Sequence, residues 1–237
     1  MAIKTILGRV VVEIQRQNLR IPGPVPCPPR IMEAMSNPMI NHRGPEFKEI
    51  LYRVTDHLKR IFVTSNDLYI LTASGTGGLE ASLINTLSSG DRVLATITGS
   101  FGKRYADMAD AIGADVTRLE FEWGTDVSLQ RLRNALEVDP AIKAVLVTHN
   151  ETSTGVTNDL KAIAGIVKGE FNRLLLVDAI SSLGCIPLPV DDWQCDVVVT
   201  ASQKGFLVPP GLSFISFGPG AWKAQSEISV RGHYFDL

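Results

Sequence analysis

The sequence predicts an α/β protein of three layers, in which helices cover both faces of a mostly parallel sheet. Short, almost wholly apolar runs alternate along the chain with segments of helical periodicity. Runs this apolar are typical of strands buried on both faces, and alternation of strand and helix is typical of a parallel sheet. The expected strands are residues 68–72, 93–97, 116–121, 144–148, 174–177, 196–200 and 212–217.

Helices are expected between these strands. Apolar residues recur with helical spacing over residues 47–58, directly after Gly44 and Pro45. The other expected helices are residues 76–87, 102–112, 128–136, 159–167 and 221–226. The stretch 21–29 can form neither a helix nor a central strand, because its prolines lack an amide hydrogen and fix φ. We therefore expect an N-terminal arm, residues 1–30, and one large domain, residues 31–237.

Composition excludes several classes of function. The chain has 237 residues, a net charge of −2 and 45% hydrophobic residues, as an ordinary globular enzyme does. This charge gives no electrostatic reason to expect nucleic acid or a membrane as a partner. No apolar stretch reaches the roughly 18 residues of a transmembrane helix, and we see no signal peptide at the start. Three cysteines without metal-ligand spacing fit a reducing compartment, so we expect no metal site and a cytoplasmic protein.

Three strand ends carry the groups that could perform chemistry. Lys204 follows the strand 196–200, Asp178 ends the strand 174–177, and Ser74-Gly75-Thr76 lies between the strand 68–72 and a helix. In a parallel sheet these ends meet at one edge. A lysine amine, a carboxylate and a phosphate-binding turn are the set that pyridoxal phosphate (PLP) requires. The sequence therefore predicts a PLP site.

Each of these features also has an ordinary structural interpretation. Ser74 is a good N-cap residue, Asp178 could cap the turn that follows it, and a lysine at a strand end often extends into solvent. Two further segments lie at the same expected edge. The run from Thr148 to Gly155 is dense in hydrogen-bonding groups, and Phe101 follows another strand. Phe101 could belong to the core or lie flat on a cofactor ring.

The order of these motifs resembles the class V aminotransferases among fold-type I PLP enzymes. It looks closest to the group of alanine–glyoxylate, serine–glyoxylate and serine–pyruvate aminotransferases. The matching residues are Pro22-Gly-Pro, His42-Arg-Gly-Pro-Glu-Phe47, Ser74-Gly-Thr-Gly, Thr148-His-Asn-Glu-Thr-Ser-Thr-Gly155, Leu176-Val-Asp-Ala-Ile-Ser-Ser-Leu-Gly184 and Ser202-Gln-Lys204. Together they cover residues 21 to about 220.

The resemblance implies a role for each matching residue. Lys204 binds the cofactor aldehyde covalently and later moves a proton, and Asp178 pairs with the pyridine nitrogen. The phosphate is held by Ser74, Gly75, Thr76 and Gln203, the ring hydroxyl side is contacted by Thr152, and the two ring faces are covered by Phe101 and Ile180. The resemblance also implies a homodimer that acts on small amino acids and 2-oxo acids.

The chain departs from the resemblance at its end. Similar enzymes add a smaller C-terminal domain with an arginine that binds the substrate carboxylate, and nothing of this kind follows in the 237 residues. We therefore expect a truncated chain, the PLP-binding large domain without its C-terminal small domain. Two alternatives to an aminotransferase are a PLP lyase or desulfurase and a non-catalytic, PLP-binding subunit. None of Cys27, Cys185 and Cys195 favours the desulfurase.

Overall fold

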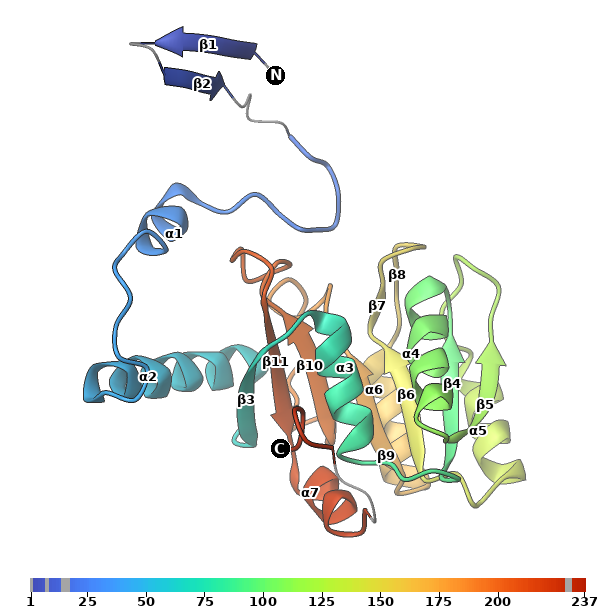
Figure 1. Cartoon of the computed structure of the whole chain (residues 1–237). Helices are drawn as coiled ribbons and strands as arrows, with labels where there is room; N and C mark the ends of the chain where they lie inside the picture. The colour runs from blue at the N-terminus through green and yellow to red at the C-terminus, as the bar shows by residue number, and fades with distance from the viewer. Residues whose placement is uncertain (1, 7–8, 14–17, 229–231) are drawn as a thin grey trace.

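The computed structural model describes residues 2–6, 9–13, 18–228 and 232–237 (Figure 1). Its centre is a seven-stranded sheet in the order β3-β11-β10-β9-β6-β4-β5. The strands are β3 (Asp67–Thr72), β4 (Arg92–Ile97), β5 (Asp115–Glu120), β6 (Ala144–Thr148), β9 (Leu174–Asp178), β10 (Val197–Ala201) and β11 (Leu212–Phe217). β11 is antiparallel to both β10 and β3, whereas every other pair in the sheet is parallel. The mostly parallel sheet is therefore confirmed.

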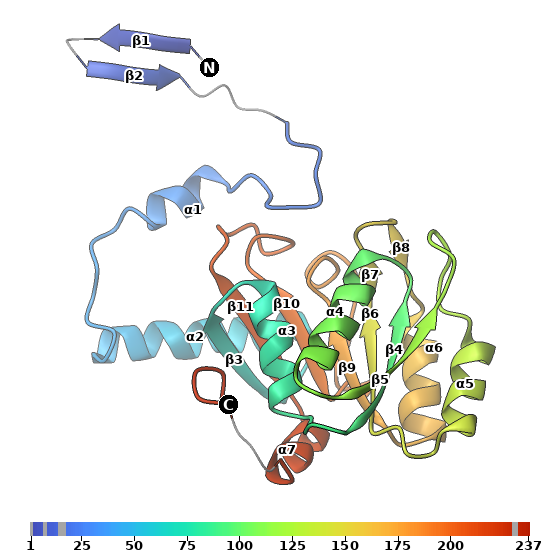
Figure 2. The same ribbon diagram turned by 45° about the vertical axis from the view of Figure 1, so that its right-hand side comes forward.

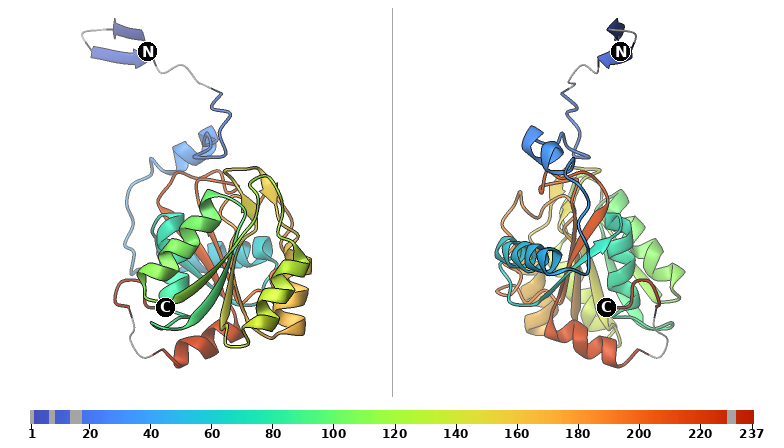
Figure 3. Two further views of the ribbon diagram at one scale, coloured as in Figure 1. Left: turned by 90° about the vertical axis from the view of Figure 1, so that its right-hand side faces the viewer. Right: turned by 60° about the vertical axis from the view of Figure 1, so that its left-hand side comes forward.

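Helices cover both faces of this sheet, as the three-layer prediction requires (Figures 2 and 3). One face packs against α3 (Gly75–Ile84), α4 (Ser100–Ala111) and α7 (Pro219–Ser226). The other packs against α5 (Leu129–Val138), α6 (Leu160–Ala164) and the end of α2 (Pro45–Phe62). Alternate strand residues face the two layers: Val197 and Val199 contact one, and Val198 the other.

Burial explains why the strands were apparent in the sequence. Every residue of β6 and of β10 is buried, so both strands are apolar except for one threonine each, Thr148 and Thr200. The side chain of Ser74 caps α3 by accepting a hydrogen bond from the Gly77 backbone N–H at 3.2 Å. α2 begins at Pro45, the expected start, and ends before Val63, whose backbone is left-handed with φ of 50°.

Several elements differ from the expected pattern. Residues 2–6 and 9–13 form an antiparallel pair, β1 (Ala2–Ile6) and β2 (Arg9–Glu13), within a segment of mixed composition. A short helix, α1 (Pro29–Ala34), begins inside the proline-rich stretch, because proline is well suited to the first position of a helix. The expected helix 159–167 divides into α6 and a π-helix over residues 165–170. In the part of the chain that is described, no helix is long and apolar enough to cross a membrane.

Candidate active site at the carboxyl edge of the sheet

The carboxyl ends of six strands lie along one edge of the sheet. β3 and β10 run in the same direction, because both are antiparallel to β11 between them. β9, β6, β4 and β5 continue in that direction. The residues that follow β3, β4, β6, β9 and β10 therefore share the upper edge in Figure 1. The expected convergence of the strand ends is confirmed.

Asp178 is a buried carboxylate at the end of β9. Its side chain is 4% exposed, and Oδ1 accepts a hydrogen bond from the Ile180 backbone N–H at 2.9 Å. Burial raises the pKa of Asp178 to about 6, and the hydrogen bond from Ile180 opposes the rise. The charge of Glu151 raises the pKa further, whereas Lys204 and Arg104 lower it. A cationic group placed beside Asp178 would therefore stabilise its charged form.

Lys204 lies in the turn that follows β10 and is partly buried. Burial lowers the pKa of its amine, and the charge of Asp178 acts in the opposite direction. Each of the two groups thus affects the titration of the other. Ser202 anchors this turn: its Oγ donates to the Pro209 carbonyl at 2.7 Å and accepts from the Leu212 N–H at 3.3 Å. The lysine therefore projects from a restrained loop.

The N-terminal arm packs directly on Lys204. The Val25 N–H donates to the Gln203 carbonyl at 3.0 Å. A Cβ placed on Gly23 would lie 2.5 Å from Cδ of Lys204, and Gly23 also has φ of 145°. Both the close approach and the backbone conformation require glycine here. The N-terminal arm was expected from the sequence, but a part for Gly23 in the site was not.

The turn Ser74-Gly75-Thr76 begins α3 beside β9 and β10. A Cβ on Gly75 would lie 2.6 Å from Ile180 Cδ1 and 3.2 Å from the Ala201 Cβ, so glycine permits the helix to start against both strands. Thr76 is exposed, and Ser74 already serves as the cap. Oε1 of Gln203 is buried and has no hydrogen-bond partner within the described ranges. The turn at the start of α3 fits an anion such as a phosphate group, whereas Oε1 of Gln203 is an acceptor and requires a donor.

Glu151 holds the start of α4, and this role was missed in the sequence. The carboxylate is fully buried and accepts from the backbone N–H groups of Phe101 at 3.1 Å and Gly102 at 3.0 Å. It also accepts from Ser153 Oγ at 2.6 Å. Gly99, the N-cap residue of α4, provides no side-chain cap, so Glu151 replaces it from another element. The signal in the sequence was an acid inside a polar run that follows a buried strand.

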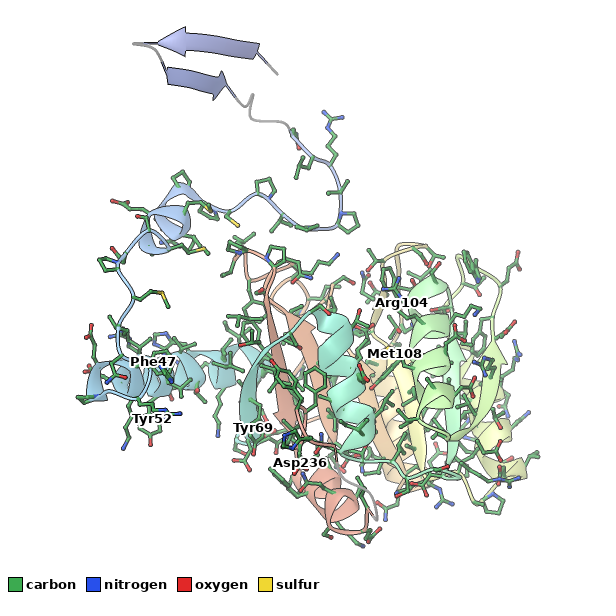
Figure 4. The ribbon with its side chains drawn as sticks, viewed as in Figure 1. Phe47, Tyr52, Tyr69, Arg104, Met108 and Asp236 are labelled. Atoms are coloured by element: carbon green, nitrogen blue, oxygen red, sulfur yellow. The ribbon has the colours of Figure 1, made fainter. Side chains whose placement is uncertain are left out.

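Phe101 and Thr152 occupy positions at the same edge. The Phe101 ring is partly buried, and the Arg104 guanidinium lies over it, 5.1 Å from the ring centre. Figure 4 shows Arg104 on α4, at the end nearest this edge. Thr152 Oγ1 donates to Ser181 Oγ at 2.9 Å, one residue after Ile180. All the site residues expected from the sequence thus lie in the strand-end segments that share this edge.

The remaining polar groups of the run 148–155 are mainly structural. His149 is buried, its Nδ1 pairs with Ser182 Oγ at 3.0 Å, and burial lowers its pKa to about 4. The Asn150 amide donates to Ser181 Oγ at 2.9 Å. The burial of His149 indicates that it is a core residue and not part of a binding segment. Among the described residues, no group of His, Cys, Asp and Glu could hold a metal ion.

An α/β sheet with an acid, a lysine and an anion-binding turn at one edge defines a class of PLP-dependent enzyme domain. The model of the family named aminotransferase class-V matches residues 30–236. The chain belongs to that family, and its fold is the PLP-dependent aminotransferase fold. Membership implies PLP as the cofactor, and the glycine-based start of α3 fits its phosphate.

Three comparisons place the chain among known proteins. It is 42% identical to the "Soluble hydrogenase, small subunit" of Synechococcus sp., over 92% of this chain and 58% of that protein. It is 38% identical to the serine–glyoxylate aminotransferase of Methylorubrum extorquens, over 93% of this chain and 57% of that protein. The crystal structure of alanine–glyoxylate aminotransferase from Nostoc sp. matches 94% of this chain and 61% of that one, with a TM-score of 0.87 and 32% identity. The chain thus spans somewhat more than half the length of these relatives.

Proposed function

We propose that this chain is the cofactor-binding domain of an aminotransferase that moves an amino group from a small amino acid to glyoxylate or pyruvate. Alanine and serine are the proposed donors. The observation that carries the proposal is that Asp178 and Lys204 lie at one sheet edge, near enough for their charges to affect each other, in a chain of the class-V family. Relatives named as serine–glyoxylate and alanine–glyoxylate aminotransferases support this choice of substrates.

Lys204 and Asp178 have complementary proton chemistry in this proposal. PLP, when bound, supplies an electron sink for the bond broken at the substrate Cα. The lowered pKa of Lys204 increases the fraction of neutral amine, which is the form that attacks an aldehyde. The same Nζ then accepts and returns the substrate proton. Asp178 would stay charged beside the ring nitrogen of the cofactor, and its carboxylate would keep that nitrogen protonated.

The other residues orient the cofactor. Its phosphate binds to Ser74, Gly75 and Thr76, with the side chain of Gln203 as an additional donor. Support comes from the N-terminus of α3, and Gln203 contributes through Nε2, the donor of its side-chain amide.

Three side chains then fix the plane of the ring. Phe101 covers one face and Ile180 the other. Thr152 lies on the side of the ring hydroxyl, where its hydrogen bond to Ser181 fixes its direction. These contacts exclude water from the reacting bonds.

The assembly that we propose is a cytoplasmic homodimer. The cytoplasmic location is supported by three free cysteines, which fit a reducing compartment. The dimer is supported by exposed apolar side chains on α2, among them Leu51, Tyr52 and Ile61. The domain division that we propose is an N-terminal arm over residues 1–30 and a PLP-binding large domain over residues 31–237.

The test is a titration of the chain with PLP, followed by the addition of alanine or serine. We expect an absorption band of covalently bound PLP that borohydride fixes to the peptide containing Lys204, and a shift of the band when the amino acid is added. The Lys204→Ala variant should show neither, whereas Lys161→Ala, which changes an exposed lysine, should behave as the parent. A reduced adduct on any other lysine would overturn the assignment.

A second candidate is a subunit that binds PLP without turnover. The observation in its favour is the 42% identity to a relative named as a soluble hydrogenase small subunit. In this case the band of bound PLP forms on Lys204 but stays unchanged on addition of any amino acid. Fusion to the C-terminal domain of a related aminotransferase should then restore the spectral shift if the scaffold itself is competent.

A further inference from the structure

A cavity lies at the amino-terminal edge of the sheet, opposite the candidate active site. It has a volume of about 260 Å³, several times the ~30 Å³ of one water molecule in the liquid. It is bounded by the starts of β6 and β9 and by one side of α7, which lies below the sheet in Figure 1. The lining residues are Lys143, Lys168, Asn172, Arg173, Leu174, Gly220, Lys223, Ala224 and Glu227.

The lining carries four cations from four different segments. Lys143 pairs with Asp91 at 2.7 Å, and Lys168 pairs with Asp196 at 2.7 Å. Neither Arg173 nor Lys223 is in an ion pair with any residue that the structure describes. Glu227 is the one acid in the lining, so the four cations exceed the three nearby acids by one. The empty cavity thus has a surplus of positive charge.

Arg173 is a partly buried cation in the lining of this cavity. Its Nη2 donates to the Pro140 carbonyl at 2.6 Å, whereas its Nε is buried and has no partner within the described residues. The backbone at Arg173 is held in place, because its N–H donates to the Val167 carbonyl at 2.9 Å. The preceding residue, Asn172, has a left-handed backbone with φ of 50°. The guanidinium therefore has a fixed place at the wall of the cavity, and its charge is in no ion pair among the described residues.

We propose that this cavity binds a small phosphate-bearing anion with two or more negative charges. The guanidinium of Arg173 matches the geometry of phosphate oxygens, and the ammonium of Lys223 adds a flexible second charge. The site is separate from the cofactor site, because Leu174 and Asp178 lie at opposite ends of β9, about 13 Å apart at ~3.3 Å per residue. The proposal does not depend on the proposed aminotransferase function.

Calorimetric titration of the whole chain with pyrophosphate, inorganic phosphate and glycerol 3-phosphate tests the proposal. The chain is first loaded with PLP and then freed of excess PLP by desalting, so that the turn at the cofactor site is occupied while no free PLP competes for the cavity. We expect one saturable site per chain that weakens as salt is added. Lys223→Ala should weaken binding about tenfold, the loss of one charged contact, whereas Lys223→Arg should bind nearly as well as the parent. Stronger binding of glycerol 3-phosphate than of inorganic phosphate would identify a phosphate ester as the ligand.

The matched control is Lys161→Ala, which removes an exposed lysine outside this cavity and should leave the affinity unchanged. Arg173→Gln, checked for folding by circular dichroism, should weaken binding at least as much as Lys223→Ala. Absence of saturable binding up to ~1 mM would overturn the proposal, as would equal affinities of the parent and Lys223→Ala. Because Lys223 reports on this cavity alone, the result is informative even if the chain fails to bind PLP.

Discussion

Asp178 is the residue on which the chemistry of the site depends most. It is a buried acid at the end of a strand. Burial raises its pKa, and the charge of Lys204 opposes that rise. This acid is removed from solvent, and no cationic group among the described residues forms an ion pair with it. A pyridinium N–H would supply one, so binding energy and proton control come from the same carboxylate.

We predict that Asp178→Asn leaves the fold intact but slows the amino-acid-dependent change of bound PLP about a hundredfold, or ~2.7 kcal/mol. An amide cannot stabilise the charged pyridinium. Stopped-flow absorbance with alanine or serine measures the rate, in the chain itself or in a version with a C-terminal domain. The control is Asp126→Asn, the same change at an exposed acid. A rate within about threefold of the parent, below ~0.7 kcal/mol, would refute the role.

Glu151 should contribute to stability through the start of α4. Its two oxygens accept from backbone N–H groups of Phe101, Gly102 and Ser153. In Glu151→Gln one oxygen becomes an NH₂ group that faces donors, so we expect a loss of about 2 kcal/mol in the free energy of unfolding. Urea unfolding measures it, with Glu122→Gln at an exposed acid as the control. A loss below ~0.5 kcal/mol would show that the cap is not needed.

His149 should make the protein sensitive to acid. Its pKa is about 4 when folded and near 6.5 when exposed, so below pH 6.5 the unfolded state binds the proton and the folded state does not. This stabilisation is complete above pH 6.5 and is lost as the pH falls towards 4, by about 2 kcal/mol between pH 7.5 and 5. Asp178 has the opposite effect, because its raised pKa stabilises the fold as the pH falls below about 6.

The contribution of His149 is isolated by a comparison of variants. The parent should lose more stability than His149→Gln between pH 7.5 and pH 5 in urea unfolding, while His57→Gln, at an exposed histidine, should follow the parent. Equal losses in the parent and His149→Gln would mean that the buried ring is protonated without cost.

At the scale of elements, α3 is the helix whose position matters most. It carries the anion-binding turn at its start and packs on β10 and β11 along its length. A Cβ on Gly78 would lie 1.9 Å from Ser213 Oγ and 2.8 Å from Val199 Cγ1. The close approach of helix and sheet therefore depends on a residue without a side chain, which in turn sets where the turn Ser74-Gly75-Thr76 lies.

We predict that Gly78→Ala destabilises the chain by about 1–3 kcal/mol through overpacking and weakens PLP binding, because α3 must move away from the sheet. Urea unfolding and PLP titration measure the two effects. Gly165→Ala is the matched control, since its backbone is helical and a Cβ there meets nothing within 4 Å. This control should be neutral or slightly stabilising. Unchanged stability of Gly78→Ala would show that the sheet can adjust.

At the scale of the whole molecule, α2 leaves an apolar surface uncovered. Two of its residues, Leu58 and Phe62, are buried in the core, whereas Leu51 and Tyr52 are 41% and 65% exposed. Figure 4 shows Tyr52 on the part of α2 farthest from the sheet. Exposed methionines on and after α1, such as Met35 and Met39, extend the apolar character of this region. Such surfaces usually mark contacts with another chain.

We predict that the chain self-associates through α2 and that Leu51→Lys shifts the equilibrium towards the monomer. A charge placed in an apolar interface must be desolvated, which weakens association by at least about tenfold. Sedimentation equilibrium measures the effect. The control is Val138→Lys, which adds the same charge at an exposed apolar residue of α5. If both variants associate as the parent does, the interface lies elsewhere.

The sequence by itself determined the layers, the strands and the position of the candidate site. Buried strands such as β6 and β10 are almost wholly apolar, and parallel strands end at a common edge, so Lys204 and Asp178 could be placed together from the sequence. The start of α3 was predicted from a local signal, because a serine before the first turn is a common helix cap.

Contacts between distant segments were decided by the tertiary structure alone. Glu151 caps α4 across 49 or 50 positions of the chain, and Gly23 packs on Lys204 across a still longer separation. The β1–β2 pair and the cationic cavity beside α7 also escaped prediction, since neither has a local pattern. Local periodicity and caps reflect short-range forces that act along the chain, whereas a cap from another element or a cluster of charges exists only once packing has brought its parts together.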